Sequence, residues 1–292
     1  MDADLDTLAT ALYVRTDDLL KVSPGRAPAR PTVGITPRIT DAELVTLAVM
    51  QALLGRTSEA RWLRFAHAQL RHLFPYLPQQ PGYNKRLRAL ARVISHLAVS
   101  SPSFCDNLRL MDSTPVPCGQ SRETARRSEL AGHAAYGWCK SHSRYFWGFR
   151  LYVLCAPDGM PICFELAAAN VAERVVAAEM LDRIDLHGYT VMADKGFAGA
   201  DFEQHIAALG ARFLRPDRKD EPHRHGSLGP VRQWIESVFW TCKGQLTLEA
   251  HGGRTIEGLC TRVALRLLAL AAGLLHNQDI GDPGRHFAAY GH

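Results

Sequence analysis

Two aspartates at the ends of predicted strands are the residues best placed to do chemistry. Residues 108–114 alternate between apolar and polar side chains and stop at Pro115, which predicts a strand ending in Asp112. Residues 189–193 form a short apolar run of the buried-strand kind, and Asp194 follows it. Because the carboxyl ends of neighbouring strands in an open sheet meet at one crevice, we expect Asp112 and Asp194 to lie close together.

A third carboxylate, Glu236, lies on a helix predicted over residues 231–243. At 100° per residue, Arg232, Glu236 and Lys243 fall within roughly 40° of one another on one stripe of that helix. A surface helix with an Arg–Glu pair four residues apart would look the same. The helix alone therefore leaves open whether Glu236 belongs to a site or to an exposed ion pair.

Three carboxylates in one place repel one another, and this points to a bound cation. At about 4 Å, a pair of like charges costs about 4 kcal/mol at an effective dielectric constant of about 20. With oxygen ligands only, Mg²⁺ or Mn²⁺ is favoured over zinc. Two such ions could activate a water molecule or a 3′-hydroxyl and stabilise the leaving oxygen of a phosphodiester. The sequence thus predicts metal-dependent phosphoryl transfer.

The composition is that of a globular chain of 292 residues with a net charge of +5. Its seven cysteines are scattered and odd in number, which indicates reduced thiols in a cytosolic setting rather than a disulfide framework. The N-terminus is acidic and unlike a signal peptide. The most apolar run, residues 263–275, is too short to span a bilayer and predicts a core helix, so no membrane partner is expected.

The first hundred residues are predicted to be helical and to bind nucleic acid. Helices are expected over 3–21, over 41–54 behind a Thr40–Glu43 capping box, from Ser58 to about 73, and over 84–100. Eight basic residues between positions 55 and 98 oppose the single acid Glu59: Arg56, Arg61, Arg64, Arg71, Lys85, Arg86, Arg88 and Arg92. Basic helices with interleaved aromatic residues suit DNA phosphates, although a solvated basic face is the alternative.

Residues 101–280 are predicted to form an α/β domain, followed by a tail over 281–292. The strand ending in Asp112 precedes a hairpin of strands over 147–155 and 161–166. A helix then opens at a predicted capping box, Asn170 to Glu173. The strand before Asp194, a helix over 201–209 and a strand over 211–214 complete a mixed sheet of five strands.

Three sequence blocks resemble the catalytic blocks of the DDE insertion-sequence transposases. They are Met-Asp-Ser-Thr-Pro-Val (111–116), Ala-Asp-Lys-Gly-Phe (193–197) and the spacing from Arg232 through Glu236 to Lys243. Upstream, Phe-Pro-Tyr-Leu-Pro (74–78) and Tyr-Asn-Lys-Arg (83–86) resemble the insertion sequence 982 group in particular. The resemblance covers nearly the whole chain, and the three blocks in this order are quite specific.

The resemblance implies a ribonuclease H-like core preceded by an all-helical region, with Asp112, Asp194 and Glu236 as ligands of two Mg²⁺ or Mn²⁺ ions. It implies cleavage and joining of double-stranded DNA at the terminal inverted repeats, by a homo-oligomer, in the bacterial cytoplasm at the nucleoid. Basic residues are then assigned to DNA: Arg232, Lys243, Lys195, Arg61, Arg64, Lys85, Arg86 and Arg88. One departure is Gly229, where related transposases often carry a tyrosine.

Other candidate sites are weaker. The spacing of His133, Cys139 and His142 could suggest a zinc site, but no second pair matches Cys139 and His142. His223 and His225 lie in a predicted loop before the catalytic helix. A second loop, expected over the active site, carries Arg122, Arg126, Arg127, Lys140 and Arg144. The alternative functions are a catalytically inactive DNA-binding protein or regulator derived from a transposase, and a nuclease without strand transfer.

Overall fold

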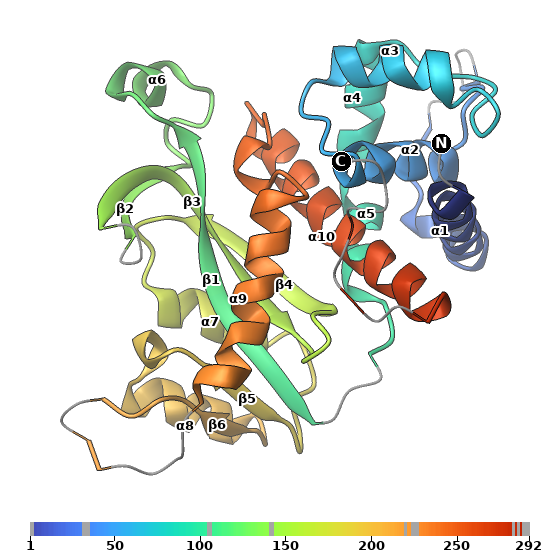
Figure 1. Cartoon of the computed structure of the whole chain (residues 1–292). Helices are drawn as coiled ribbons and strands as arrows, with labels where there is room; N and C mark the ends of the chain where they lie inside the picture. Colours follow the sequence, from blue (N-terminus) through green and yellow to red (C-terminus); the bar gives the residue numbers. More distant parts are fainter. Residues whose placement is uncertain are drawn as a thin grey trace. The chain divides into compact units, whose positions relative to one another are not determined.

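The computed structural model describes residues 3–30, 36–103, 107–139, 143–218, 221–222, 228–281, 284 and 287. The chain forms two compact units (Figure 1). One, here the helical unit, comprises Met1–Ser100 with Thr241–His292, and the other, the sheet unit, comprises Ser101–Trp240. The expected segments 1–100, 101–280 and 281–292 follow chain order, whereas the helical unit is assembled from both ends of the chain.

The helical unit contains helices before residue 100 and a long C-terminal helix. The segment 84–100, expected as one helix, is divided into two at Leu90, and the first of these begins at Gln80. Its elements are α1 (Ala3–Val22), η1 (Pro24–Arg26), α2 (Asp41–Leu53), α3 (Glu59–Gln69), α4 (Gln80–Ala89), α5 (Ala91–Val99), η4 (Leu248–Ala250) and α10 (Ile256–Asp279). The capping box at α2 is formed, because Thr40 accepts from the Glu43 amide and Glu43 accepts from the Thr40 amide. Ser58 caps α3 as predicted.

Helix α10 is the core of the helical unit. It packs against α5 and α2, and most residues of its apolar stretch are buried. In the described part of the chain it is the one helix long and apolar enough to cross a membrane, yet 78% of that window is buried inside the protein. The prediction of a core helix over 263–275 is therefore confirmed.

The sheet unit is built on a mixed sheet with helices packed against it. Its elements are β1 (Leu108–Gly119), α6 (Arg122–Arg127), β2 (Ala135–Cys139), β3 (Arg144–Cys155), β4 (Pro161–Ala168), α7 (Glu173–Leu181), β5 (Thr190–Ala193), η3 (Lys195–Phe197), α8 (Ala200–Ala208) and β6 (Arg212–Leu214). Helix α9 (Gly229–Gly244) follows and runs across the boundary of the two units. The region expected as a loop after the first catalytic strand contains the short helix α6 instead.

The strand order is β2-β3-β1-β5-β6, with β4 paired to β3 beside β2. Strand β1 is antiparallel to β3 and parallel to β5, and β5 is parallel to β6. The α/β class is confirmed, but the sheet has six strands rather than five. The additional strand is β2, whose outward residues Tyr136 and Trp138 are aromatic, so that the alternation of apolar and polar residues typical of a strand is hidden.

Strand β1 does not stop at Pro115, as the sequence predicts, but continues to Gly119. Its parallel pairing with β5 ends at Met111, while its antiparallel pairing with β3 continues beyond Pro117. Beyond Met111 one edge of β1 thus has no partner strand among the described residues. Proline lacks an amide hydrogen and is tolerated at such an edge, which explains why it does not end the strand.

A single apolar core joins the sheet to α7 and α8. It contains Met111 and Tyr152 from the sheet, Val176 and Met180 from α7, and Phe202 from α8. This packing anchors the N-terminal end of α7 and the short segment after β5. Glu173 is the first residue of α7, and Asp194 lies between β5 and η3.

Candidate active site

Asp112 and Asp194 occupy equivalent places on neighbouring parallel strands. Met111 and Ala193 are the last aligned pair of β1 and β5, so the two aspartates are the next residue on each strand. Oδ1 of Asp112 accepts from the Ser113 amide at 2.8 Å, and Oδ1 of Asp194 accepts from the Lys195 amide at 2.7 Å. The structure thus places the two carboxylates side by side at the C-terminal end of the parallel pair.

The electrostatics of the site are dominated by negative charge. The pKa of Asp112 is raised to about 7, first by burial and then by the charge of Asp194, while the amide hydrogen bond of Ser113 lowers it. Arg232 also lowers the pKa, and the charge of Glu173 again raises it. Carboxylates gathered in this way favour either a proton or a cation between them.

On helix α9, Arg232 forms ion pairs with both Glu236 and Asp194 and so links them. The guanidinium of Arg232 lies 3.5 Å from Oδ1 of Asp194 and 3.4 Å from Oε1 of Glu236. The Glu236 side chain is 56% exposed. The Arg–Glu ion pair four residues apart is therefore formed, and the same guanidinium also pairs with Asp194.

The three predicted ligands do not form a ready metal cluster. Within the described ranges, no group of three or more His, Cys, Asp or Glu side chains is arranged to hold a metal ion. Arg232 provides the positive charge between Asp194 and Glu236 instead. The two aspartates supply oxygen ligands without nitrogen or sulfur, and this donor set fits a hard divalent ion such as Mg²⁺. Because Mg²⁺ is usually held by one or two carboxylates together with substrate phosphates, a pair of aspartates is sufficient on the protein side.

Glu173 is a site residue that the sequence analysis missed. It was assigned to a capping box, but no side-chain cap forms at the N-terminus of α7, where Ala172 is the capping residue. Instead, Oε1 of Glu173 lies 3.1 Å from the guanidinium of Arg150 and accepts from the Ser113 hydroxyl at 3.3 Å. Arg150 also donates to that hydroxyl at 3.4 Å. Glu173 is thereby tied to the residue next to Asp112.

Gly196 shows that Glu173 and Asp194 face the same space. A Cβ atom at Gly196 would lie 3.4 Å from Oε2 of Glu173 and 3.9 Å from Oδ2 of Asp194. Asp112, Asp194 and Glu173 therefore belong to one acidic site, with Arg150 and Arg232 as its cations. Strand pairing that is remote in sequence creates this grouping, so the sequence carries no local signal for Glu173.

The residues predicted to bind DNA lie in different environments. On α9, Lys243 pairs with Glu249 at 3.3 Å, while Lys195 is exposed immediately after Asp194. Gly229, at the position of the tyrosine in related transposases, is the first residue of α9. Arg86 is held by Asp41 at 2.5 Å and by the Ile39 carbonyl at 2.8 Å, which makes it less available than the other basic residues of the helical unit that were predicted to bind DNA.

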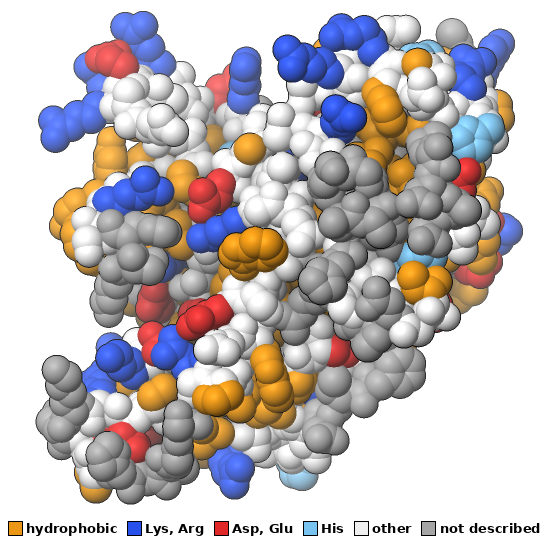
Figure 2. All heavy atoms as spheres, viewed as in Figure 1, with side chains coloured by type: hydrophobic (Ala, Val, Ile, Leu, Met, Phe, Trp, Pro, Cys, Tyr) orange, Lys and Arg blue, Asp and Glu red, His pale blue; other side chains and the backbone are white. Residues whose placement is uncertain are grey.

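The remaining basic residues predicted to bind DNA from the helical unit are exposed: Arg61, Arg64, Lys85 and Arg88. Figure 2 shows Lys and Arg side chains gathered over the region of α3. Basic side chains on this surface are free to meet a polyanion, as the charge distribution of the sequence predicts.

A second surface feature lies beside β2 and β3, where aromatic side chains that the sequence did not point to accompany the predicted basic residues. Exposed aromatic and basic side chains line a cavity of about 650 Å³, among them Arg122, Arg126, Tyr136 and Tyr145. Such a combination suits stacking of bases and contact with phosphates. Of the weaker candidates, Cys139 is buried on β2, whereas Lys140, His142, His223 and His225 lie outside the described residues.

Comparison with known proteins connects this geometry to a family. A family model described as Transposase DDE domain matches residues 103–272, more than half of the chain. Among solved structures, the chain is similar to piggyBac transposase in a synaptic complex with hairpin DNA. The TM-score is 0.51 at 8% identity, over 97% of this chain and 77% of that one. At this identity the likeness concerns the fold, and it confirms the ribonuclease H-like α/β class. No curated protein matches the sequence.

Proposed function

The chain belongs to the transposase DDE domain family, and from this premise we propose that it cuts and joins DNA at the ends of an insertion sequence. The reaction would be hydrolysis of a phosphodiester at the element end, followed by attack of the released 3′-hydroxyl on target DNA. No covalent protein intermediate is needed, so no serine or tyrosine nucleophile is assigned. The finer assignment to the insertion sequence 982 group rests on the N-terminal sequence blocks alone.

The observation that carries this proposal is the position of Asp112 and Asp194, each of which directly follows the last aligned pair of β1 and β5, Met111 and Ala193. The oxygen atoms of the two aspartates would hold a divalent metal ion. The raised pKa of Asp112, which is caused first by burial and then by the charge of Asp194, supports a cation at this place. When bound, Mg²⁺ or Mn²⁺ ions, two in the full site, supply Lewis-acid stabilisation of the attacking and leaving oxygens. Glu236 is the third metal ligand that we propose.

The cations of the site have separate roles in this proposal. The positive charge of Arg232 offsets the negative charges of Asp194 and Glu236. DNA phosphates would compete with these two carboxylates for the guanidinium of Arg232. Arg150 holds Glu173 and the Ser113 hydroxyl, and it thereby positions the backbone that carries Asp112. Lys195, exposed beside Asp194, would contact a phosphate of the DNA being cut.

Double-stranded DNA is the proposed partner of the helical unit as well. The exposed basic residues of α3 and α4 would bind the terminal inverted repeats, since each neutralised phosphate adds salt-dependent affinity. The structural relative is described in a synaptic complex with hairpin DNA. We propose that this chain acts as a homo-oligomer on DNA, at the bacterial nucleoid.

A cleavage and joining assay tests the proposal. The substrate is the genomic DNA that brackets the gene, incubated with the full chain and Mg²⁺ or Mn²⁺. We expect cleavage and joining by the wild type, loss of both in Asp112→Asn and Asp194→Asn, and no change in Asp201→Asn, an exposed aspartate on α8. Full activity of Asp112→Asn would overturn the metal site.

Two further outcomes separate the alternatives. Tight binding of the ends without cleavage by the wild type would favour the inactive DNA-binding protein. Cleavage without joined products, although target DNA is present, would favour the simple nuclease.

A further inference from the structure

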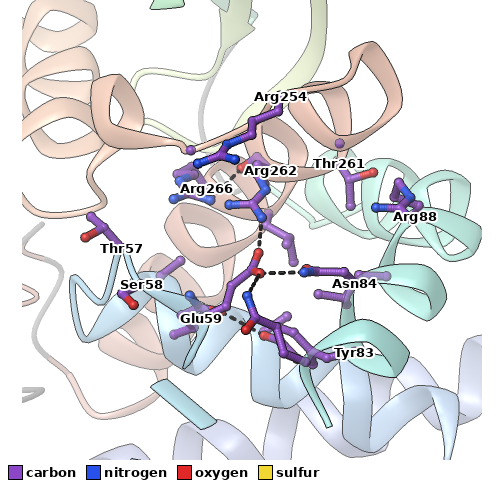
Figure 3. Close-up of a pocket in the computed structure, with 18 of the residues that line it drawn as sticks. Thr57, Ser58, Glu59, Tyr83, Asn84, Arg88, Arg254, Thr261, Arg262 and Arg266 are labelled. Carbon is purple, nitrogen blue, oxygen red and sulfur yellow. Dashed lines mark hydrogen bonds and ion pairs between the residues drawn. The ribbon is translucent and has the colours of Figure 1, made fainter. Parts of the chain in front are cut away.

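The helical unit contains a polar cavity of about 520 Å³ that the proposed catalytic site does not use (Figure 3). Its walls come from α2, α3, α4, the segment before α10 and the N-terminal half of α10. This volume lies in the range of small-molecule binding sites. The lining is rich in side chains that donate hydrogen bonds, including Asn84, Gln80, Thr57 and Thr261.

The charge of the lining is strongly positive. Four arginines line the cavity, Arg88, Arg254, Arg262 and Arg266, against one acid, Glu59. Figure 3 shows Glu59 held by Arg262 and Asn84, and Gln80 donates to the same carboxylate at 3.2 Å.

Glu59 is neutralised by Arg262, so three guanidinium groups of the cavity have no acidic partner in the described part of the chain. Arg88 and Arg254 are both exposed and accessible from solvent. The charge that remains in the cavity is therefore available to an anion.

Arg266 is the residue that points most directly to a ligand. Arg266 is only 6% exposed and lines the cavity, and its Nε atom has no hydrogen-bond partner among the residues that the structure describes. One terminal nitrogen donates to the Arg262 carbonyl at 3.1 Å. Burial, and then the charge of Arg262, lowers the pKa of Arg266 to about 10. A buried guanidinium with an unsatisfied donor is costly unless an anion accepts from it.

Two helix N-termini add to this positive potential. Ser58 caps α3 and Thr255 caps α10, and both capping residues line the cavity. The amides of a first helical turn favour negative charge, and phosphate groups often bind there. The arginines and the two helix ends thus act on the same space.

We propose that this cavity binds a phosphate group of the DNA backbone. A tetrahedral anion with several acceptor oxygens matches guanidinium donors arranged around one space. DNA is favoured over a free anion as its source because the exposed basic residues Arg61, Arg64 and Lys85 lie on α3 and α4, two of the helices that form the cavity. The choice of DNA rests on the proposed function, whereas the phosphate site itself does not.

The first experiment tests the phosphate site without DNA. The thermal midpoint of the full chain is compared in inorganic phosphate and in chloride at equal ionic strength and pH. We expect phosphate, at several times its Kd, to raise the midpoint of the wild type by roughly 2–4 °C. The effect should disappear in the double variant Arg88→Gln/Arg254→Gln and persist in Arg26→Gln, an exposed arginine of η1 outside the cavity. Equal midpoints in phosphate and chloride for the wild type, or an unchanged response of the double variant, would overturn the proposal.

A substitution at the buried Arg266 tests the same site independently. Arg266→Met keeps the length and apolar volume of the side chain and removes the guanidinium. If it folds, as judged by circular dichroism, it should also lose the phosphate response. A folded Arg266→Met variant with the wild-type response would count against the proposal, and the exposed double variant decides the matter if Arg266→Met does not fold.

The second experiment identifies the source of the phosphate. Binding of a short duplex is measured by fluorescence anisotropy over a range of salt concentrations. The steepness of log K against log salt should decrease by about one for each DNA phosphate that Arg88→Gln/Arg254→Gln no longer neutralises, and it should remain unchanged in Arg26→Gln. A response to inorganic phosphate with an unchanged slope overturns the DNA source. If the wild type binds no duplex, the proposed function fails and the DNA source fails with it, but the thermal experiment still decides the phosphate site.

Discussion

Asp112 is the residue whose protonation should be measurable without DNA. In the metal-free chain, its carboxyl keeps a proton up to about pH 7 in the folded state but only to about pH 3.8 when unfolded. The folded state therefore binds more protons between these values, and the free energy of unfolding should fall as the pH rises from about 4 to about 7. Urea denaturation at a series of pH values in EDTA measures this fall.

The Asp112→Asn variant is the matched comparison for this titration, because it lacks the ionisable group. Its unfolding free energy should show a smaller fall over the same pH interval, and Mg²⁺ should stabilise the wild type more than the variant near pH 7. Asp201→Asn should behave like the wild type. Equal pH profiles for wild type and Asp112→Asn would show that the raised pKa of Asp112 does not exist.

Glu173 should contribute to stability through its pair with Arg150, whose side chain is only 13% exposed. Glu173→Gln keeps an acceptor for the Ser113 hydroxyl but removes the charge that Arg150 faces. We expect a loss of about 1–3 kcal/mol in the free energy of unfolding at pH 8. The same variant should lower the pKa of Asp112, since the charge of Glu173 raises it.

The control for this pair is Glu123→Gln on α6. Glu123 pairs with Arg126 and Arg127, but its side chain is 62% exposed and those of its partners are more exposed still. Its loss should change stability by less than about 0.5 kcal/mol. Comparable losses from both variants would mean that the Arg150–Glu173 pair contributes no more than a surface pair.

Gly273 of helix α10 lies against the ring of Phe287, the last residue that the structure describes. The ring of Phe287 is fully buried, and a Cβ at Gly273 would lie 2.5 Å from its Cε1. Although alanine is favoured over glycine within a helix by about 1 kcal/mol, a rigid ring cannot yield by that distance without repacking. We expect Gly273→Ala to lower the free energy of unfolding by about 1–3 kcal/mol in urea denaturation.

A double-mutant cycle identifies the cause of that loss. Phe287→Ala should itself be destabilising, because it leaves a cavity beside α10. In the Phe287→Ala background the Gly273→Ala change should be neutral or stabilising, since the clash is gone and the helix propensity remains. Additive losses would show that Gly273 does not serve to accommodate Phe287.

The assembly of the helical unit from both ends of the chain predicts how fragments behave. Val93, Ile94 and Leu97 of α5 are buried, and α10 packs on this helix. A fragment of residues 1–100 would expose these side chains to water. We expect it to lack a cooperative unfolding transition and to bind a hydrophobic dye, whereas residues 1–100 joined to 241–292 by a flexible linker should unfold cooperatively. Cooperative unfolding of 1–100 alone would contradict this assembly.

Two capping boxes illustrate why some of the structure could be predicted and some could not. The box between Thr40 and Glu43 forms because both partners lie within one turn and no other group competes for them. At α7, the same pattern fails because Glu173 meets Arg150 and Ser113, which come from other strands. A local sequence pattern predicts a capping interaction correctly only when no residue distant in sequence forms a stronger interaction with the same side chain.

The sequence by itself determined most helices of the N-terminal region, the strand that carries Asp112, the strand that precedes Asp194 and the helix that carries Arg232 and Glu236. These follow from periodicity, capping and turn residues, all of which act over a few neighbouring positions. Only the tertiary structure decided that Arg232 lies between Asp194 and Glu236, that Glu173 joins the acidic site, and that α10 completes the helical unit. Those outcomes depend on strand pairing and helix packing between residues far apart in the chain, and no local pattern encodes them.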